Sequence, residues 1–244
     1  AMSQSSLVAV PLPDGDSMRA LLALPDSAGD GVARPAVLVI HDIYGFSDDI
    51  QRIARRFADS GYAALAPALF DGAGAPGLCV LRTFRDYQRR EGAAFERIEA
   101  AQRFLADAAE VDPERIGITG FCLGGGFSIF YAARGGVRVC APYYGDTPDD
   151  ADALRQVCPV VAGFGELDRS FAAQGRRLDS HLEKLAIPHD IKIYPGVGHS
   201  YMNDHGPGRI ASALMRATPL HAGYDEAAAE DSWERMLRFF EEHL

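Results

Sequence analysis

Residues 115–126 read Arg-Ile-Gly-Ile-Thr-Gly-Phe-Cys-Leu-Gly-Gly-Gly. The run from Ile116 to Thr119, rich in β-branched residues, predicts a buried strand, and the segment from Phe127 to Ala133 predicts a helix. Between them lies Cys122, in a turn of the form Gly-x-Cys-x-Gly. In such a turn, side chains two positions either side of the central residue would collide with the strand and the helix. The pattern therefore predicts a nucleophile at a strand-to-helix turn, with cysteine where most such turns carry serine.

Cys122 has two interpretations at this point. A cysteine between a buried strand and a buried helix is often a small core residue. At the N-terminus of a helix, however, the unpaired N–H groups and the helix dipole favour a thiolate, which is the nucleophilic form. The rest of the chain must decide between the two.

Length and charge narrow the class of protein. The chain has 244 residues, enough for one large α/β domain, so we expect a single domain over residues 1–244, with Ala1 as a tag remnant before Met2. The net charge of −10 argues against a nucleic-acid partner or an anionic membrane. We expect a small-molecule substrate instead, and a monomer or a weak homo-oligomer.

The cysteines and the N-terminus bear on compartment and metal content. Cys79, Cys122, Cys140 and Cys158 form no CxxC pair, so a structural zinc site is not expected. We see no signal-peptide pattern and no apolar run long enough to span a bilayer. These features predict a cytoplasmic protein with reduced thiols.

Strand and helix patterns alternate along the chain. Predicted strands cover residues 19–24, 36–40, 63–66, 116–119, 139–143, 160–164 and 190–194, and predicted helices cover 48–60, 93–108, 127–133, 172–185 and 227–243. Repeated strand–helix units predict an α/β fold with a mostly parallel sheet and helices on both faces. Two stretches, 70–91 and 203–225, fit neither pattern and are expected to be irregular, as binding loops often are.

Reactive side chains follow three of the predicted strands. Cys122 follows the strand at 116–119, Asp168 comes four residues after the strand at 160–164, and His199 comes soon after the strand at 190–194. In open α/β sheets, ligands bind beyond the carboxyl ends of the strands. The order nucleophile, acid, base is that of the α/β-hydrolase fold.

These residue types fit acyl transfer. His199 would take the thiol proton or pair with the thiolate, and Asp168 would orient the imidazole. Two backbone N–H groups would form an oxyanion hole: that of Leu123, after the nucleophile, and that of Ile43, in the loop after the strand at 36–40.

Several stretches, in this order, resemble the dienelactone hydrolase family. The turn around Cys122 is the most specific of them, because related hydrolases mostly have serine in place of this cysteine. The stretches are His41-Asp42-Ile43-Tyr44-Gly45, Ser60-Gly61-Tyr62-Ala63-Ala64-Leu65-Ala66-Pro67, Gly120-Phe121-Cys122-Leu123-Gly124-Gly125, Tyr143-Tyr144-Gly145, Gly165-Glu166-Leu167-Asp168 and Gly198-His199-Ser200-Tyr201.

The resemblance implies hydrolysis of a lactone or related ester through a thioester acyl-enzyme, without a metal or organic cofactor. It also implies an acidic residue that controls the protonation of the thiol. The family's type member has Glu at that place, whereas this chain has Asp42, which is one methylene shorter.

Substrate contacts are less defined. The family's type member binds the carboxylate of its substrate with arginines, one of which lies shortly after the catalytic histidine. In this chain, residues 200–203 contain no arginine. Arg82, Arg85 and Arg89 would share one face if their segment is helical. That face would be either a binding site for an anion or simply a charged surface in contact with solvent. Tyr144 and Tyr201 are further candidates for substrate contact.

Three alternatives remain. The same triad would serve an esterase or thioesterase of broader specificity, and the same fold would serve a non-catalytic ligand-binding protein. A metal hydrolase is disfavoured, because the six-residue spacing of His199 and His205 matches no familiar ligand pattern.

Overall fold

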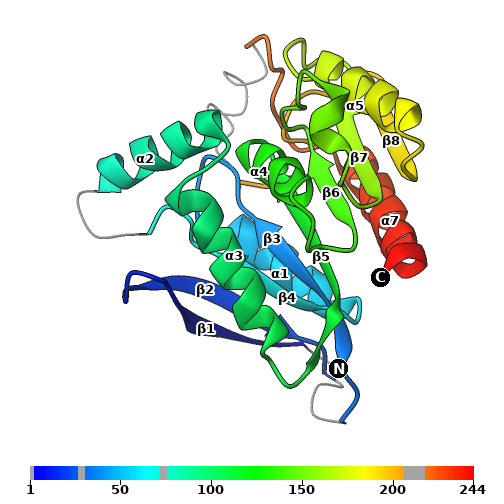
Figure 1. Ribbon diagram of the computed structural model, residues 1–244. Helices are drawn as coiled ribbons and strands as arrows, with labels where there is room; N and C mark the ends of the chain where they lie inside the picture. Colours follow the sequence, from blue (N-terminus) through cyan, green and yellow to red (C-terminus); the bar gives the residue numbers. More distant parts are fainter. Residues whose placement is uncertain (1–2, 27–30, 72–75, 206–217) are drawn as a thin grey trace. The chain divides into compact units, whose positions relative to one another are not determined.

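Strands and helices alternate along the chain in the computed structural model (Figure 1). The structure describes residues 3–26, 31–71, 76–205 and 218–244. One eight-stranded sheet has the order β1-β2-β4-β3-β5-β6-β7-β8. By contacts, the chain divides into two compact units, residues 1–118 and 119–244, with the boundary inside β5. The expectation of a single domain stays a prediction.

Each predicted strand and helix is present with bounds within two residues, except that the strand predicted at 116–119 and the helix predicted at 127–133 begin four or five residues earlier. The strands are β1 (Gln4–Pro11), β2 (Ser17–Leu24), β3 (Arg34–Ile40), β4 (Ala63–Pro67), β5 (Val111–Phe121), β6 (Cys140–Tyr143), β7 (Val160–Gly165) and β8 (His189–Tyr194). The helices are α1 (Asp48–Asp59), α2 (Pro76–Arg89), α3 (Ala93–Ala106), α4 (Leu123–Ala132), α5 (Ala172–Lys184) and α7 (Glu226–His243), with a 3₁₀ turn at Ala151–Leu154. The mostly parallel sheet with helices is confirmed.

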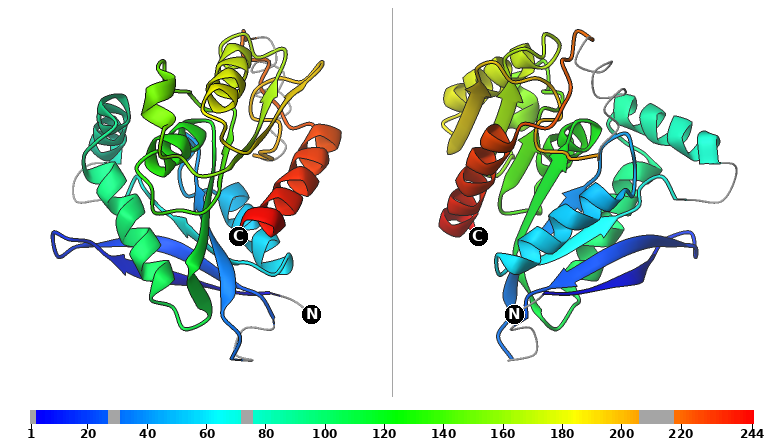
Figure 2. Two further views of the ribbon diagram at one scale, coloured as in Figure 1. Left: turned by 45° about the vertical axis from the view of Figure 1, so that its right-hand side comes forward. Right: turned by 180° about the vertical axis from the view of Figure 1, so that it is seen from behind.

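The unit of residues 1–118 contains the antiparallel edge of the sheet. Strand β1 pairs with β2 from Gln4↔Leu24 to Pro11↔Ser17, and β2 pairs with β4 in the same antiparallel sense. Strands β3 and β4 are parallel. Helices α1 and α3 cover opposite faces of these strands (Figure 2). Helix α1 begins where the Ser47 hydroxyl accepts the N–H of Ile50.

Two elements of this unit were not predicted. Strand β1 was missed, and the stretch 70–91, expected to be irregular, contains helix α2. Helix α2 is held to α3 by the buried carboxylate of Asp86, whose Oδ2 accepts the N–H of Ala94 at 3.1 Å. This contact between helices is not visible as a sequence pattern, which explains the wrong prediction.

The unit of residues 119–244 contains three parallel strands. Strand β6 pairs with β7, and β7 pairs with β8 from Val160↔His189 to Gly165↔Tyr194. Helices α4 and α5 lie on one face of these strands and α7 on the other (Figure 2). Because the strands are parallel, the loops after β7 and β8 leave the sheet at the same edge.

Helices that might cross a membrane were sought within the described ranges. None of the helices there is long and apolar enough to do so.

Candidate active site

Cys122 occupies a strained backbone position between β5 and α4. Its φ is 54° and its ψ is −115°, a conformation that residues with a side chain rarely adopt. From Thr119 to Ala132 every residue is buried except Cys122, which is part exposed. The sharp turn therefore lifts one thiol toward solvent from a buried stretch.

Gly120 makes this turn sterically feasible. A Cβ atom at residue 120 would lie 2.1 Å from the carbonyl oxygen of Gly124 and 2.5 Å from the hydroxyl oxygen of Ser128. Both distances are far shorter than real contacts. The glycine at position 120 is thus required by the close approach of the strand to the first turns of α4.

Asp168 and His199 come together at the ends of β7 and β8. The Nδ1 atom of His199 lies 2.5 Å from Oδ2 of Asp168, and the two side chains are 4% and 0% exposed. Cys122 contributes to the raised pKa of the same imidazole, so its side chain lies near His199. The structure thus brings together the three residues that the sequence predicts as nucleophile, base and acid.

The pKa of His199 is raised above its usual value. Burial alone would lower this pKa, but the hydrogen bond to Asp168 and the interactions with Cys122 raise it to about 9. With both ring nitrogens protonated, Nδ1–H donates to the Asp168 carboxylate. The carboxylate thus stabilises the protonated form of the imidazole.

The second oxygen of Asp168 is also occupied. Its Oδ1 accepts the N–H groups of Ser170 and Phe171 at 3.2 Å each. The loop that carries Asp168 approaches the histidine loop closely, because a Cβ at Gly165 would lie 2.3 Å from the Gly198 carbonyl oxygen. The backbone N–H groups and the close approach of the two loops therefore fix the position of the carboxylate that binds the imidazole.

The histidine loop is fixed by the chain that precedes α7. The N–H of His199 donates to the Leu220 carbonyl at 2.8 Å, and the N–H of Gly223 donates to the His199 carbonyl at 3.0 Å. The N–H of Asp225 donates to the Tyr201 carbonyl at 3.0 Å. Backbone bonds on both sides of the imidazole thus define its position.

Two aromatic rings contact His199. The ring of Tyr144 lies 5.1 Å from the imidazole, centroid to centroid, and that of Phe171 lies 4.9 Å away. Phe171 was not predicted as a site residue, because its place depends on the turn in which Asp168 accepts the N–H groups of Ser170 and Phe171.

The tyrosines predicted to contact substrate are fully buried. The Tyr144 hydroxyl donates to Oδ1 of Asn203 at 2.5 Å, and the Tyr201 hydroxyl shares a 2.8 Å hydrogen bond with the Ser232 hydroxyl. Leu123, the predicted oxyanion donor beside the nucleophile, is the first residue of α4. N–H groups of a first helical turn have no partner within the helix.

The other predicted site residues lie in the unit of residues 1–118. Asp42 is buried, and its Oδ1 accepts the N–H of Tyr44 at 2.8 Å. Ile43, the predicted second oxyanion donor, has a side chain that is 49% exposed. Arg82 and Arg85 lie on the exposed surface of α2, which is helical as their shared face requires. Their roles stay predictions.

The remaining cysteines differ from Cys122. Cys79 and Cys140 are buried, and desolvation raises the pKa of the Cys140 thiol well above its usual value. Desolvation also raises the pKa of the Cys158 thiol to about 12. Neither Cys140 nor Cys158 is therefore poised to form a thiolate at neutral pH.

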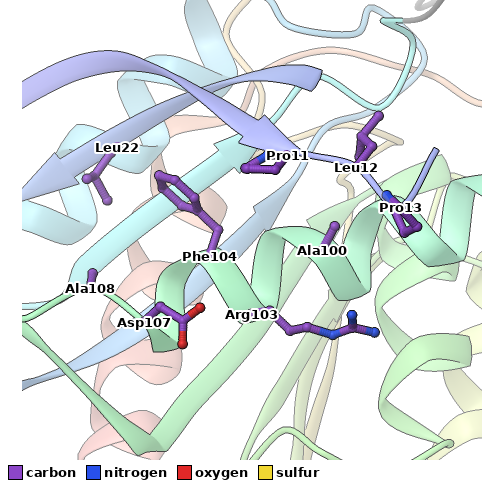
Figure 3. Close-up of a pocket in the computed structure, with 9 residues that line it drawn as sticks. All are labelled: Pro11, Leu12, Pro13, Leu22, Ala100, Arg103, Phe104, Asp107 and Ala108. Atoms are coloured by element: carbon purple, nitrogen blue, oxygen red, sulfur yellow. The ribbon is translucent and has the colours of Figure 1, made fainter. Parts of the chain in front are cut away.

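A cavity of about 490 Å³ lies in the unit of residues 1–118, between α3 and the first two strands (Figure 3). Phe104 points from α3 toward the strands (Figure 3). The lining residues are Pro11, Leu12, Pro13, Leu22, Ala100, Arg103, Phe104, Asp107 and Ala108. None of the predicted catalytic residues is among them, so this cavity is not the predicted active site. In the parts of the chain that the structure describes, no three His, Cys, Asp or Glu side chains gather as a metal site.

The family of the chain follows from comparison with known proteins. The sequence model of the dienelactone hydrolase family matches residues 18–244. The chain belongs to the dienelactone hydrolase family. It is thus a carboxylic ester hydrolase, as the sequence predicts.

Curated relatives and solved structures agree with this family. A Salmonella typhimurium protein named "Putative carboxymethylenebutenolidase" is 30% identical, over 94% of this chain and 84% of the relative. A Saccharolobus solfataricus protein of the same name is 26% identical, over 93% of this chain and 94% of the relative.

Among solved structures, the dienelactone hydrolase of Anabaena variabilis has a TM-score of 0.72 at 18% identity, with 100% of both chains covered. A dienelactone hydrolase-like promiscuous phosphotriesterase from metagenomic libraries has a TM-score of 0.79 at 20% identity, covering 100% of this chain and 99% of the other. At these identities the structures show the fold, and the predicted α/β-hydrolase fold is confirmed.

Proposed function

We propose that this dienelactone hydrolase family member cleaves a lactone or a related carboxylic ester through a Cys122–His199–Asp168 triad and a covalent acyl-enzyme. One observation carries the proposal. Cys122, part exposed at a strained turn, interacts with an imidazole that binds a buried carboxylate through Nδ1. Nucleophile, base and orienting group in mutual contact are the signature of nucleophilic acyl transfer.

The first half of the reaction forms a thioester. The Sγ thiolate of Cys122 attacks the carbonyl carbon, and the carbonyl oxygen becomes an oxyanion. We expect two backbone N–H groups to stabilise it, that of Leu123 after the nucleophile and that of Ile43 in the loop after β3. When the C–O bond breaks, the leaving alkoxide takes the Nε2 proton of His199. In a lactone this alcohol stays attached to the acyl group.

The second half releases the acid. Neutral His199 removes a proton from a water molecule, whose oxygen attacks the thioester carbonyl carbon. The C–S bond breaks, the carboxylic acid leaves, and Cys122 returns as the thiolate beside the imidazolium. Asp168 keeps its negative charge throughout and stabilises the cation on His199.

A broader esterase or thioesterase is the second candidate. It is favoured by residues 200–203, which offer no arginine for a substrate carboxylate. A panel of lactones, aryl esters and thioesters, each with and without a carboxylate, separates the two functions. Rates confined to lactones favour the first candidate, whereas comparable rates on neutral aryl esters favour the second.

The nucleophile is tested with Cys122→Ala, and Cys158→Ala serves as the matched control because Cys158 is also part exposed. Cys122→Ala should abolish turnover and the acyl adduct seen by mass spectrometry of the intact protein. Cys158→Ala should keep both. Full activity of Cys122→Ala would exclude the cysteine mechanism, and a folded protein inactive on every ester would support a binding function.

A further inference from the structure

We propose that Phe171 is a positioning residue of this active site, whose aromatic ring holds and stabilises the imidazolium of His199. The inference rests on the proposed triad. The ring centroid of Phe171 lies 4.9 Å from that of the imidazole, with the two planes at 39°. A cation within about 6 Å of an aromatic centroid is attracted by the ring's quadrupole.

Phe171 stands at the N-terminus of α5, and its own side chain makes no capping hydrogen bond. Helices prefer Ser, Thr, Asp or Asn as the capping residue, because these side chains satisfy N–H groups of the first turn. Asp168 does this here for the N–H groups of Ser170 and Phe171, so the Phe171 side chain has no capping role.

Asp168 couples Phe171 to the triad. Its Oδ1 accepts the N–H of Phe171, and its Oδ2 binds Nδ1 of His199. In addition, the N–H of Ala172 donates to the Asp168 carbonyl at 2.9 Å. One residue therefore fixes both the imidazole and the backbone from which the Phe171 ring projects.

The two rings that contact His199 differ in exposure. His199 is 3% exposed and Tyr144 is fully buried, whereas Phe171 is part exposed. Among the described residues, the titratable groups that face His199 are Asp168, Cys122 and Tyr144, and the Tyr144 hydroxyl is bound to Asn203.

The test compares side chains with and without an aromatic ring at residue 171. In Phe171→Leu, the pKa of His199, followed by NMR titration of its imidazole, should fall by about half a unit, which corresponds to about a two- to fivefold rise in its acid dissociation constant. Phe171→Tyr and Phe171→Trp should keep the pKa of the native protein. Phe171→Met gives a second non-aromatic variant if Phe171→Leu does not fold.

A matched control is available in the same unit. The ring of Phe239 lies 4.3 Å from that of His243, and Phe239→Leu should leave the pKa of His199 unchanged. Equal pKa values of His199 in Phe171→Leu, Phe239→Leu and the native protein would overturn the proposal. An equal fall in Phe171→Leu and Phe171→Tyr would overturn it too, because the ring would then not matter. The titration needs no turnover, so it is independent of whether the proposed hydrolysis occurs.

Discussion

Replacing Asp168 with Asn tests the triad most sharply. The carboxylate lies 2.5 Å from Nδ1 of His199, and both side chains are buried. An Asn amide still accepts the N–H groups of Ser170 and Phe171 through its oxygen, so the loop should keep its shape. Its NH₂ group, however, faces Nδ1 and favours the wrong tautomer of the imidazole.

The expected loss is large. The same exchange in a serine-type triad lowers kcat about 10⁴-fold, so we expect kcat/KM of Asp168→Asn to fall about 10³- to 10⁴-fold, or about 4–5.5 kcal/mol. The midpoint of thermal unfolding should change little, which separates the catalytic effect from unfolding. The pKa of His199 should fall as well, because the carboxylate contributes to its rise.

Glu166 provides the control for this prediction. It lies two residues before Asp168, is exposed, and accepts the N–H of Gly196 at 3.2 Å through Oε2. We expect Glu166→Gln to keep kcat/KM within about twofold, since exposed contacts contribute little. If Asp168→Asn retained a tenth of the native kcat/KM, or if Glu166→Gln showed the large loss instead, Asp168 would not be the triad acid.

Further predictions concern Gly120 in the turn before α4, the pKa of His199, and Asp42. Gly120→Ala should lower the midpoint of urea unfolding or prevent folding, because its Cβ would lie 2.1 Å from the Gly124 oxygen; unchanged stability would contradict the steric reading. The pKa of His199 rises from 6.5 to about 9 on folding, so the stabilisation is complete below pH 6.5 and is lost as the pH rises through about 9. Between pH 6.5 and about 9, the free energies of unfolding in urea of the native protein and of His199→Gln should differ by about 3 kcal/mol at most. Cys122→Ala should lower the pKa of His199 in an NMR titration, since the thiol contributes to its rise. Asp42→Asn should speed alkylation of Cys122 at neutral pH if a carboxylate restrains the thiolate as the family resemblance implies, whereas an unchanged rate would leave Asp42 a structural residue.

Elements with a clear periodic pattern were predicted almost to the residue. Helix α1 was expected at 48–60 and spans Asp48–Asp59, and α5 was expected at 172–185 and spans Ala172–Lys184. Strand β1 was missed, because most of its residues are exposed and a strand without a buried face gives no alternating signal. Helix α2 was missed because its stretch is rich in Gly, Arg and Pro and because its contact with α3 through Asp86 gives no sequence pattern.

The convergence of Cys122, Asp168 and His199 was predictable because it depends on topology. Each residue follows a strand, and β7 and β8 are parallel, so their following loops share one edge of the sheet. The contact of Phe171 with the imidazole was not predictable in the same way. It depends on the turn that Asp168 makes with the next backbone N–H groups, which is a matter of side-chain geometry.

The strained turn at Cys122 connects the fold to the proposed chemistry. A backbone conformation of this kind costs on the order of 1–3 kcal/mol and persists only where the surroundings determine it. Here the N–H of Cys122 donates to the Tyr143 carbonyl at 3.1 Å, and the Cys122 carbonyl accepts the N–H of Gly126 at 3.2 Å. Both polar backbone groups of the strained residue are thus satisfied, and the residue is anchored to β6 on one side and to α4 on the other. A relaxed backbone at residue 122 would break these anchors, so the packed core keeps the thiol beside His199 without help from substrate.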